Sequence, residues 1–204
     1  MKISFGQILV ILTIVGGIGI LGVLIANKSN DIEARYKEVV DVFALARDVG
    51  LDVEQFKKDI DSQEVKDKVA NDKSEATTRL NGGTYTPAIF IQGEEYKLQT
   101  LESLEAKLTE VIATTSEPVL VEEFFDFNCP HCYEFEPYVD SVKAKFGNKV
   151  NFEQRNLPFL KPSSTTYAQA AEAARKQGKF DSFVKSLFNK IHGDGSVVVS
   201  SPTI

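Results

Sequence analysis

The sequence predicts an α/β sheet with a helical subdomain, preceded by one transmembrane helix. Two observations predict this class. An uncharged, largely apolar run extends from Ile3 to Ala26, and behind it segments of helical periodicity are mixed with short β-like runs. With 204 residues, 43% of them apolar, the chain is long enough for one domain plus an appendage and too apolar for a disordered protein.

Charge and cysteine content exclude several classes of protein. The chain has 23 Lys+Arg against 29 Asp+Glu, a net charge of −6. Nonspecific nucleic-acid binding needs a basic surface that displaces counterions, so no nucleic-acid partner is expected. Two cysteines are too few for a disulfide-dense scaffold or an all-cysteine zinc site, and no metal site is expected.

Residues 1–28 are expected to form an N-terminal transmembrane anchor. About 20 apolar residues, rising ~1.5 Å each, cross the ~30 Å hydrocarbon core, and the run from Ile3 to Ala26 meets that length. Lys2 and the α-amino group lie before the run and Lys28 lies after it, a bias that favours a cytoplasmic N-terminus. The protein would then be single-pass with an extracytoplasmic domain. A cleaved signal peptide is the alternative, but its best small-residue cleavage pair lies inside the apolar run.

The first part of the domain, residues 29–204, is expected to be helical. Apolar residues recur at helical spacing from Ile32 to Ala46, and Gly50 supplies a stop. Asp52 can cap a second, short helix. A capping box at Asp61–Glu64 opens a third helix that ends near Leu80.

After Leu80 the period of the apolar residues changes. Pro87–Ile91 is a β-like run, and Tyr96–Leu98 is its expected hairpin partner across a turn at Gly93. Thr100 then caps an amphipathic helix that extends to Ile112.

The last part of the chain alternates strands and helices. The expected elements are a β-like run at Pro118–Asn128, a helix at Cys129–Phe146, a strand at Val150–Arg155, an alanine-rich helix near Thr165–Gln177 and a helix at Phe180–Ile191, followed by a loop-like tail with one possible edge strand at Val197–Val199.

Both cysteines fall in one C-x-x-C unit, Cys129-Pro130-His131-Cys132, where a strand passes into a helix. A cysteine at a helix N-terminus faces unpaired N–H groups and the positive end of the helix dipole, which favour the thiolate. His131 can add a positive charge or a hydrogen bond, and Pro130 suits the first helical turn. Cys132, one turn further in, is better shielded and suited to resolving a mixed disulfide.

Three other uses of the cysteines compete with redox catalysis. A structural disulfide this local closes too small a loop to stabilise the fold much. A zinc site needs two more ligands, and His192 is the only other histidine. Covalent haem attachment needs a histidine directly after the second cysteine, where Tyr133 stands.

The strand before the cysteines holds a second candidate, Glu123. Alternation places Glu123 on an otherwise apolar face, where burial would raise its pKa and suit it to exchange a proton with Cys132. The alternative is a solvent-facing or lysine-paired glutamate at a sheet edge. The other acids have expected roles of a simpler kind: solvent or salt-bridge positions for Glu122 and Asp126, and interaction with the helix dipole for Glu134 and Glu136.

The segment Glu123–Glu136, EFFDFNCPHCYEFE, resembles the active-site segment of DsbA-type thiol:disulfide oxidoreductases, which are thioredoxin-fold proteins with a helical insert. The dipeptide between the cysteines matches, as does the acid six residues before the first cysteine. Gly83–Ile91 resembles the family's cis-proline strand, and the helices at 41–80 and 157–191 resemble its helical insert.

The resemblance implies roles for four residues. Cys129 would have a depressed pKa, and Glu123 would be a buried proton-transfer group. The Thr86–Pro87 bond would be cis, with Pro87 beside the cysteines and offering no N–H. The backbone of Thr86 would then be free to pair with an extended substrate segment.

The order of the two halves is the reverse of the family's order. In the family the C-x-x-C half comes first and the cis-proline strand last, and the interpretation is a circular permutation with new termini in the surface insert. Exchange of halves between two chains and two incomplete domains are the alternatives. The expected division is a helical subdomain at about 31–82 and 157–192, and a thioredoxin-like core at about 83–112 and 117–156.

The expected function is that of a membrane-anchored, extracytoplasmic dithiol oxidase. Reduced exported proteins would be its substrates, a membrane reoxidant would be its partner, and the Cys129–Cys132 disulfide would serve in place of a cofactor. A disulfide reductase or isomerase is the alternative within the enzyme class. A peptide-binding module without turnover is the alternative outside it.

Overall fold

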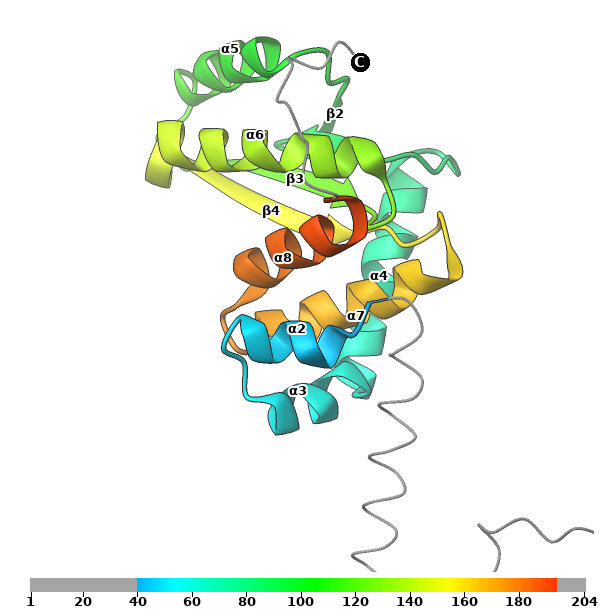
Figure 1. Cartoon of the computed structure of the whole chain (residues 1–204). Coiled ribbons are helices and arrows are strands. Elements are labelled where there is room, and N and C mark those ends of the chain that lie inside the picture. The colour runs from blue at the N-terminus through cyan, green and yellow to red at the C-terminus, as the bar shows by residue number, and fades with distance from the viewer. Residues whose placement is uncertain (1–39, 194–204) are drawn as a thin grey trace, which may run out of the picture.

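The computed structural model describes residues 40–193, a mixed α/β domain (Figure 1). Its elements, in chain order, are α2 (Val42–Asp48), α3 (Val53–Ile60), α4 (Gln63–Arg79), β1 (Ala88–Ile91), β2 (Glu94–Tyr96), α5 (Leu101–Ile112), β3 (Val119–Phe125), α6 (Pro130–Phe146), the short 3₁₀ helix η1 (Gly147–Lys149), β4 (Val150–Asn156), α7 (Pro162–Arg175) and α8 (Phe180–His192). The expected anchor and the tail after Gly193 lie outside the described residues. Within residues 40–193 no helix has the length and apolar character needed to cross a membrane.

The sheet has four strands in the order β2-β1-β3-β4. β1 is antiparallel to both β2 and β3, whereas β3 and β4 are parallel. Ala88 of β1 lies opposite Phe124 of β3, so the strand that follows Pro87 pairs directly with the strand that leads to the cysteines. The Thr86–Pro87 bond is cis, as the resemblance implied.

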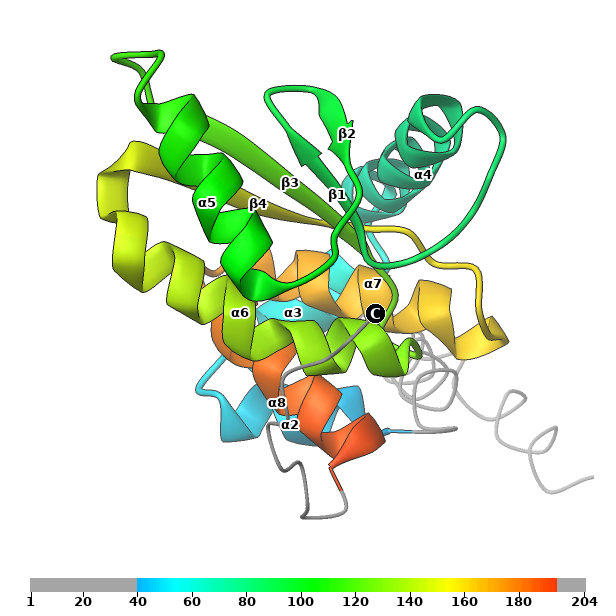
Figure 2. The same cartoon turned by 90° about the horizontal axis from the view of Figure 1, so that it is seen from above.

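Helices cover both faces of the sheet (Figures 1 and 2). α5 and α6 pack on one face, where leucines of α5 and apolar residues of α6 contact alternate residues of the strands. α4 packs on the other face, against Phe90 and Phe124. Because β3 is central and covered on both sides, its side chains are almost all buried, including two carboxylates, Glu122 and Glu123.

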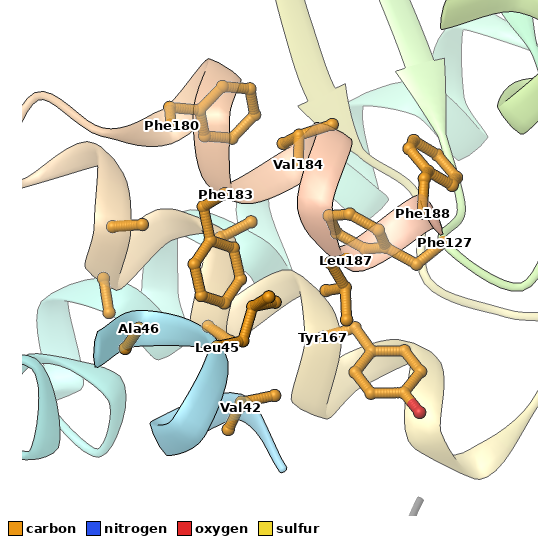
Figure 3. Close-up of a cluster of buried hydrophobic side chains, with 14 of the residues drawn as sticks. Val42, Leu45, Ala46, Phe127, Tyr167, Phe180, Phe183, Val184, Leu187 and Phe188 are labelled. Carbon is orange, nitrogen blue, oxygen red and sulfur yellow. The ribbon is translucent and has the colours of Figure 1, made fainter. Parts of the chain in front are cut away.

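The helices α2, α3, α7 and α8 group around a second apolar cluster (Figures 1 and 3). Alanines of α7 are fully buried there and let the neighbouring helices approach closely. Phe127, just after β3, enters the same cluster, with its ring 5.0 Å from that of Phe188 in α8. The chain segment before the cysteines is thereby packed against the helical cluster (Figure 3).

Three expected elements differ from the structure. Of the helix expected from Ile32 to Ala46, residues 32–39 lie outside the described residues, and α2 begins only at Val42, because Asp41 is extended and its side chain accepts hydrogen bonds from the N–H groups of Phe43 and Ala44. The hairpin partner of β1, expected at Tyr96–Leu98, is β2 at Glu94–Tyr96, because the turn at Gly93 is tight enough for Glu94 to pair with Ile91. The β-like run expected to reach Asn128 ends at Phe125, since a turn follows in which the Cys129 N–H donates to the Asp126 carbonyl at 3.0 Å.

Arg155 of β4 connects the sheet to α4 through three carboxylates. Its guanidinium lies 2.7 Å from Asp72, 2.5 Å from Glu75 and 2.8 Å from Glu122. Burial raises the pKa of Glu122, but hydrogen bonds from Arg79 and Arg155 outweigh this and hold the pKa below its usual value. Glu122 is thus a salt-bridge residue, as the sequence predicted, although it is buried rather than exposed.

Replacing Arg155 with methionine is expected to lower the free energy of unfolding by about 1.5–3 kcal/mol. The buried Asp72 and Glu122 would each lose one of two cations, and Lys68 and Arg79 would remain as their partners. Urea unfolding at pH 7 measures the change. The control is Lys107→Met, which removes an exposed pair with Glu110 and is expected to cost less than about 1 kcal/mol. Similar losses in both variants would contradict the structural role given to Arg155.

Candidate active site

The two cysteines lie where the turn after β3 enters α6. Cys129 is the N-cap of α6, and Pro130 occupies the first helical position, where its missing N–H leaves no hydrogen bond unmade. Both cysteines are free thiols, and both are buried: Cys129 is 5% exposed and Cys132 is fully enclosed. The strand-to-helix passage therefore presents one nearly buried sulfur with a second directly beneath it.

Cys129 is arranged to be a thiolate. The pKa of Cys129 is lowered to about 6. The hydrogen bond from the Cys132 thiol lowers it most, the Thr86 side chain and the backbone N–H groups of Cys132 and His131 lower it as well, and burial acts in the opposite direction. At neutral pH this sulfur is mostly ionised and nucleophilic.

Cys132 and Glu123 are shifted in the opposite direction. Burial raises the pKa of Cys132 well above its ordinary value, and the neighbouring Cys129 sulfur and Glu123 raise it further. Burial likewise raises the pKa of Glu123, which is 1% exposed, and the charge of Glu136 adds to the effect. Glu123 lies on the central strand and not at a sheet edge, so it is placed to hold a proton beside Cys132.

Gln154 links Glu123 to a second buried carboxylate, that of Glu136. The Gln154 side-chain amide donates to Glu123 at 3.1 Å and, in a short contact, to Glu136. The expectation that Glu136 mainly interacts with the helix dipole is wrong, because its side chain turns into the protein and is buried. Gln154 was missed from the sequence, although the parallel register of β3 and β4 pairs it directly with Glu123.

The side chain of His131 lies away from the sulfur. It is 66% exposed, and its Nδ1 is 3.1 Å from Glu134 Oε2. In this arrangement the hydrogen bond that His131 offers to Cys129 comes from its backbone N–H. Glu134, which was expected mainly to interact with the helix dipole, is exposed and contacts His131.

Thr86 brings the cis-proline segment onto the active-site sulfur. The Cys129 sulfur lies 3.4 Å from the Thr86 carbonyl oxygen, to which it donates when it is protonated, and both residues belong to one chain. The Thr86 hydroxyl is buried and makes no hydrogen bond within residues 40–193, so it is available to the thiolate. The backbone predicted to pair with a substrate segment thus lies beside the reactive sulfur.

Asp126 was expected to face solvent or to form a salt bridge, and the structure shows neither. Asp126 is 2% exposed and accepts hydrogen bonds from the Asn128, Phe159 and Leu160 backbone N–H groups and from the Ser164 hydroxyl, all between 2.8 and 2.9 Å. These bonds join the active-site turn to the segment between β4 and α7. Among residues 40–193 no group of three or more histidine, cysteine or acidic side chains is placed to hold a metal ion.

Comparison with known proteins agrees with this geometry. The family model described as Thioredoxin matches residues 108–196, which include the cysteines, β3 and β4. A thiol:disulfide interchange protein DsbA of Burkholderia cepacia is 30% identical over 111 residues, which are 52% of this chain and 47% of that protein. Together with the sheet, these matches support a DsbA-like thioredoxin fold and, in general terms, a thiol:disulfide oxidoreductase.

Part of the chain also resembles proteins of a different name. The Na(+)/H(+) antiporter NhaA 1 of Mycolicibacterium vanbaalenii is 32% identical over 98 residues, 47% of this chain and 16% of the antiporter. That of Salinispora arenicola is 42% identical over 65 residues, 31% of this chain and 10% of the antiporter. The chain spans less than half the length of these curated relatives, and ion transport does not follow from so small a share of an antiporter.

Replacing Thr86 with valine is expected to raise the pKa of Cys129 from about 6 toward 7, roughly a tenfold loss in the thiolate-to-thiol ratio, since valine keeps the shape and the backbone carbonyl but lacks the hydroxyl. The pH dependence of thiolate absorbance at 240 nm measures it. Thr86→Ser, which keeps a hydroxyl, is the control and should stay near the wild-type value. Equal titration of all three proteins would exclude a role for the hydroxyl.

Replacing Glu136 with glutamine is expected to stabilise the protein at pH 7, because burial raises the pKa of this carboxyl group above its ordinary value and glutamine carries no charge to bury. The pKa values of Glu123 and Glu136 are raised in the folded state, so wild-type stability falls as pH rises above their ordinary value of 4.5. Urea unfolding at pH 4 and pH 7 should show the gain only at the higher pH. The control is Glu134→Gln on the exposed side of α6, and an equal gain there would refute the explanation.

Proposed function

We propose that the chain is a thiol:disulfide oxidoreductase that acts as a dithiol oxidase. The observation that supports this best is the opposite shift of its two sulfurs: Cys129 is stabilised as a thiolate at the start of α6, while Cys132 is held as a buried thiol. A thiolate that is stable when the pair is reduced makes the disulfide a stronger oxidant.

The reaction begins with the Cys129–Cys132 disulfide. A substrate thiolate attacks the Cys129 sulfur, the bond to Cys132 breaks, and Cys132 leaves with the electron pair and takes a proton from Glu123. A second substrate thiolate then attacks the substrate sulfur of the mixed disulfide and releases Cys129 as its thiolate. Two electrons pass from the substrate dithiol to the protein, which ends as the reduced pair.

The substrate segment would lie along Thr86. An extended peptide can pair with its backbone beside Cys129, and cis-Pro87 presents no N–H that would compete. We propose reduced exported proteins as substrates. Each turnover leaves the protein reduced, so a membrane-bound oxidant is the proposed partner that restores the disulfide.

The proposal includes the location and the chain order. The uncharged run from Ile3 to Ala26 supports a single-pass anchor with the catalytic domain outside the cytoplasm. The contact between Cys129 and Thr86 within one chain, and the pairing of β1 with β3, support a circularly permuted DsbA-like domain rather than halves exchanged between chains.

Two cysteine variants test the function. With reduced, unfolded substrate protein, Cys129→Ser is expected to reduce disulfide formation to the uncatalysed rate, because the attacked sulfur is gone. Cys132→Ser, given a disulfide-bonded substrate in place of the reduced one, is expected to accumulate a mixed disulfide, seen by mass spectrometry. The Cys129 thiolate attacks the substrate disulfide, one substrate sulfur leaves as a thiolate, and no Cys132 thiol is present to release the substrate.

Three further results would contradict the proposed function. The reduction potential of the wild-type protein against glutathione should lie well above that of thioredoxin; a thioredoxin-like value would make the protein a reductase. A wild-type protein that forms no disulfides in the substrate, but binds it as well as Cys129→Ser does, would be a peptide-binding module. Activity per chain that does not change on dilution is expected for halves closed within one chain, and loss on dilution would indicate exchanged halves.

A further inference from the structure

The active-site turn is held by a residue from the distant end of the domain. The Cys129 N–H donates to the Asp126 carbonyl, so residues Asp126 to Cys129 form a β-turn, and the Phe127–Asn128 peptide is its central unit. Rotation of this central peptide separates one β-turn type from another. The orientation of the peptide thus fixes how the chain enters Cys129 and α6.

Both ends of the central peptide have partners. Its N–H, from Asn128, donates to Asp126 Oδ1 at 2.8 Å. Its carbonyl, from Phe127, lies 2.8 Å from Nε2 of His192, the last residue of α8. Because a carbonyl oxygen can only accept, Nε2 is the donor in this bond.

His192 also contacts the far side of the cysteine pair. Its ring stacks on Tyr133, with centroids 5.3 Å apart and planes 18° apart, and Tyr133 directly follows Cys132. The Tyr133 hydroxyl donates to Asn189 of α8 at 3.2 Å. One imidazole therefore contacts the residue two before Cys129 and the residue directly after Cys132.

We propose that His192 is a positioning residue for the redox pair: by holding the Phe127 carbonyl and the Tyr133 ring together, it fixes the turn and the first turn of α6 in the geometry that directs N–H donors at the Cys129 sulfur. This role rests on the proposed redox function of the two cysteines. The proposal gives the second histidine of the described residues a role that needs no metal.

His192 does not touch the Cys129 sulfur, but it can affect the stability of the thiolate through the N–H donors that surround it. The donors from Cys132 and His131 are part of the first turn of α6 and are effective only when aimed at the sulfur. If the peptide before Cys129 can rotate, these donors lose their alignment, the thiolate loses stability, and the reduced pair becomes less favourable.

Two substitutions separate the hydrogen bond from the ring. His192→Phe keeps a ring that can stack on Tyr133 but has no donor, whereas His192→Gln keeps an N–H donor at similar reach but has no ring. In the full chain we expect His192→Phe to lower the thiolate-to-thiol ratio of Cys129 at least about threefold, a shift of about 0.5 in pKa, and to lower the reduction potential. His192→Gln should restore most of both values.

The measurements are the thiolate absorbance at 240 nm against pH and the equilibrium with glutathione. His192→Leu, a second variant without a donor, should behave like His192→Phe, and it replaces that variant if the latter does not fold. Tyr133→Phe, which removes only the bond to Asn189, is the matched control and should leave the pKa of Cys129 unchanged.

Unchanged titration of the donor-free variants, or equal shifts in His192→Gln and His192→Phe, would overturn the proposal. The titration needs no substrate protein. Failure of the wild-type chain to oxidise protein thiols would therefore refute the proposed function without affecting this result.

Discussion

The register between β1 and β3 is the constraint on which the site depends. Ala88 pairs with Phe124, so the two residues before Ala88 lie beside the turn that begins at Asp126, and Thr86 reaches the Cys129 sulfur. A slip of one residue would turn every side chain of a strand to the other face of the sheet. Such a slip would turn Glu123 away from the cysteines, and it would also move Thr86 away from the Cys129 sulfur.

The same alternation gives adjacent glutamates opposite properties. Glu122 faces α4, where two arginines hold its pKa low, whereas Glu123 faces α6, where burial and Glu136 hold its pKa high. One carboxylate is a fixed charge that joins the sheet to a helix, and its neighbour is the group to which we assign proton storage in the proposed reaction. The difference lies in which side of β3 each residue faces, since the chemical group is the same.

Much of this arrangement follows from local sequence. The C-P-H-C unit, the alternation around Glu123 and the helix caps are set by residues close in the chain, and the expected strands and helices lie near the observed ones. Gln154, the burial of Glu136 and the hydrogen bonds of Asp126 depend on contacts across 18 to 38 residues. No periodicity specifies such contacts, because charged residues on a helix or after a strand have the same pattern whether they face solvent or a buried partner.

The contacts around Cys129 also explain why chain order matters little to the site. Thr86 reaches the sulfur through strand pairing, Gln154 reaches Glu123 through the neighbouring parallel strand, and His192 reaches the turn from the end of α8. None of these contacts joins residues adjacent in the chain. A rearrangement that preserves the strand register and the packing of α8 preserves the chemistry, wherever the chain is cut and rejoined. The proposed permutation is consistent with this, since new chain ends in surface helices would leave the partners of β3 in place.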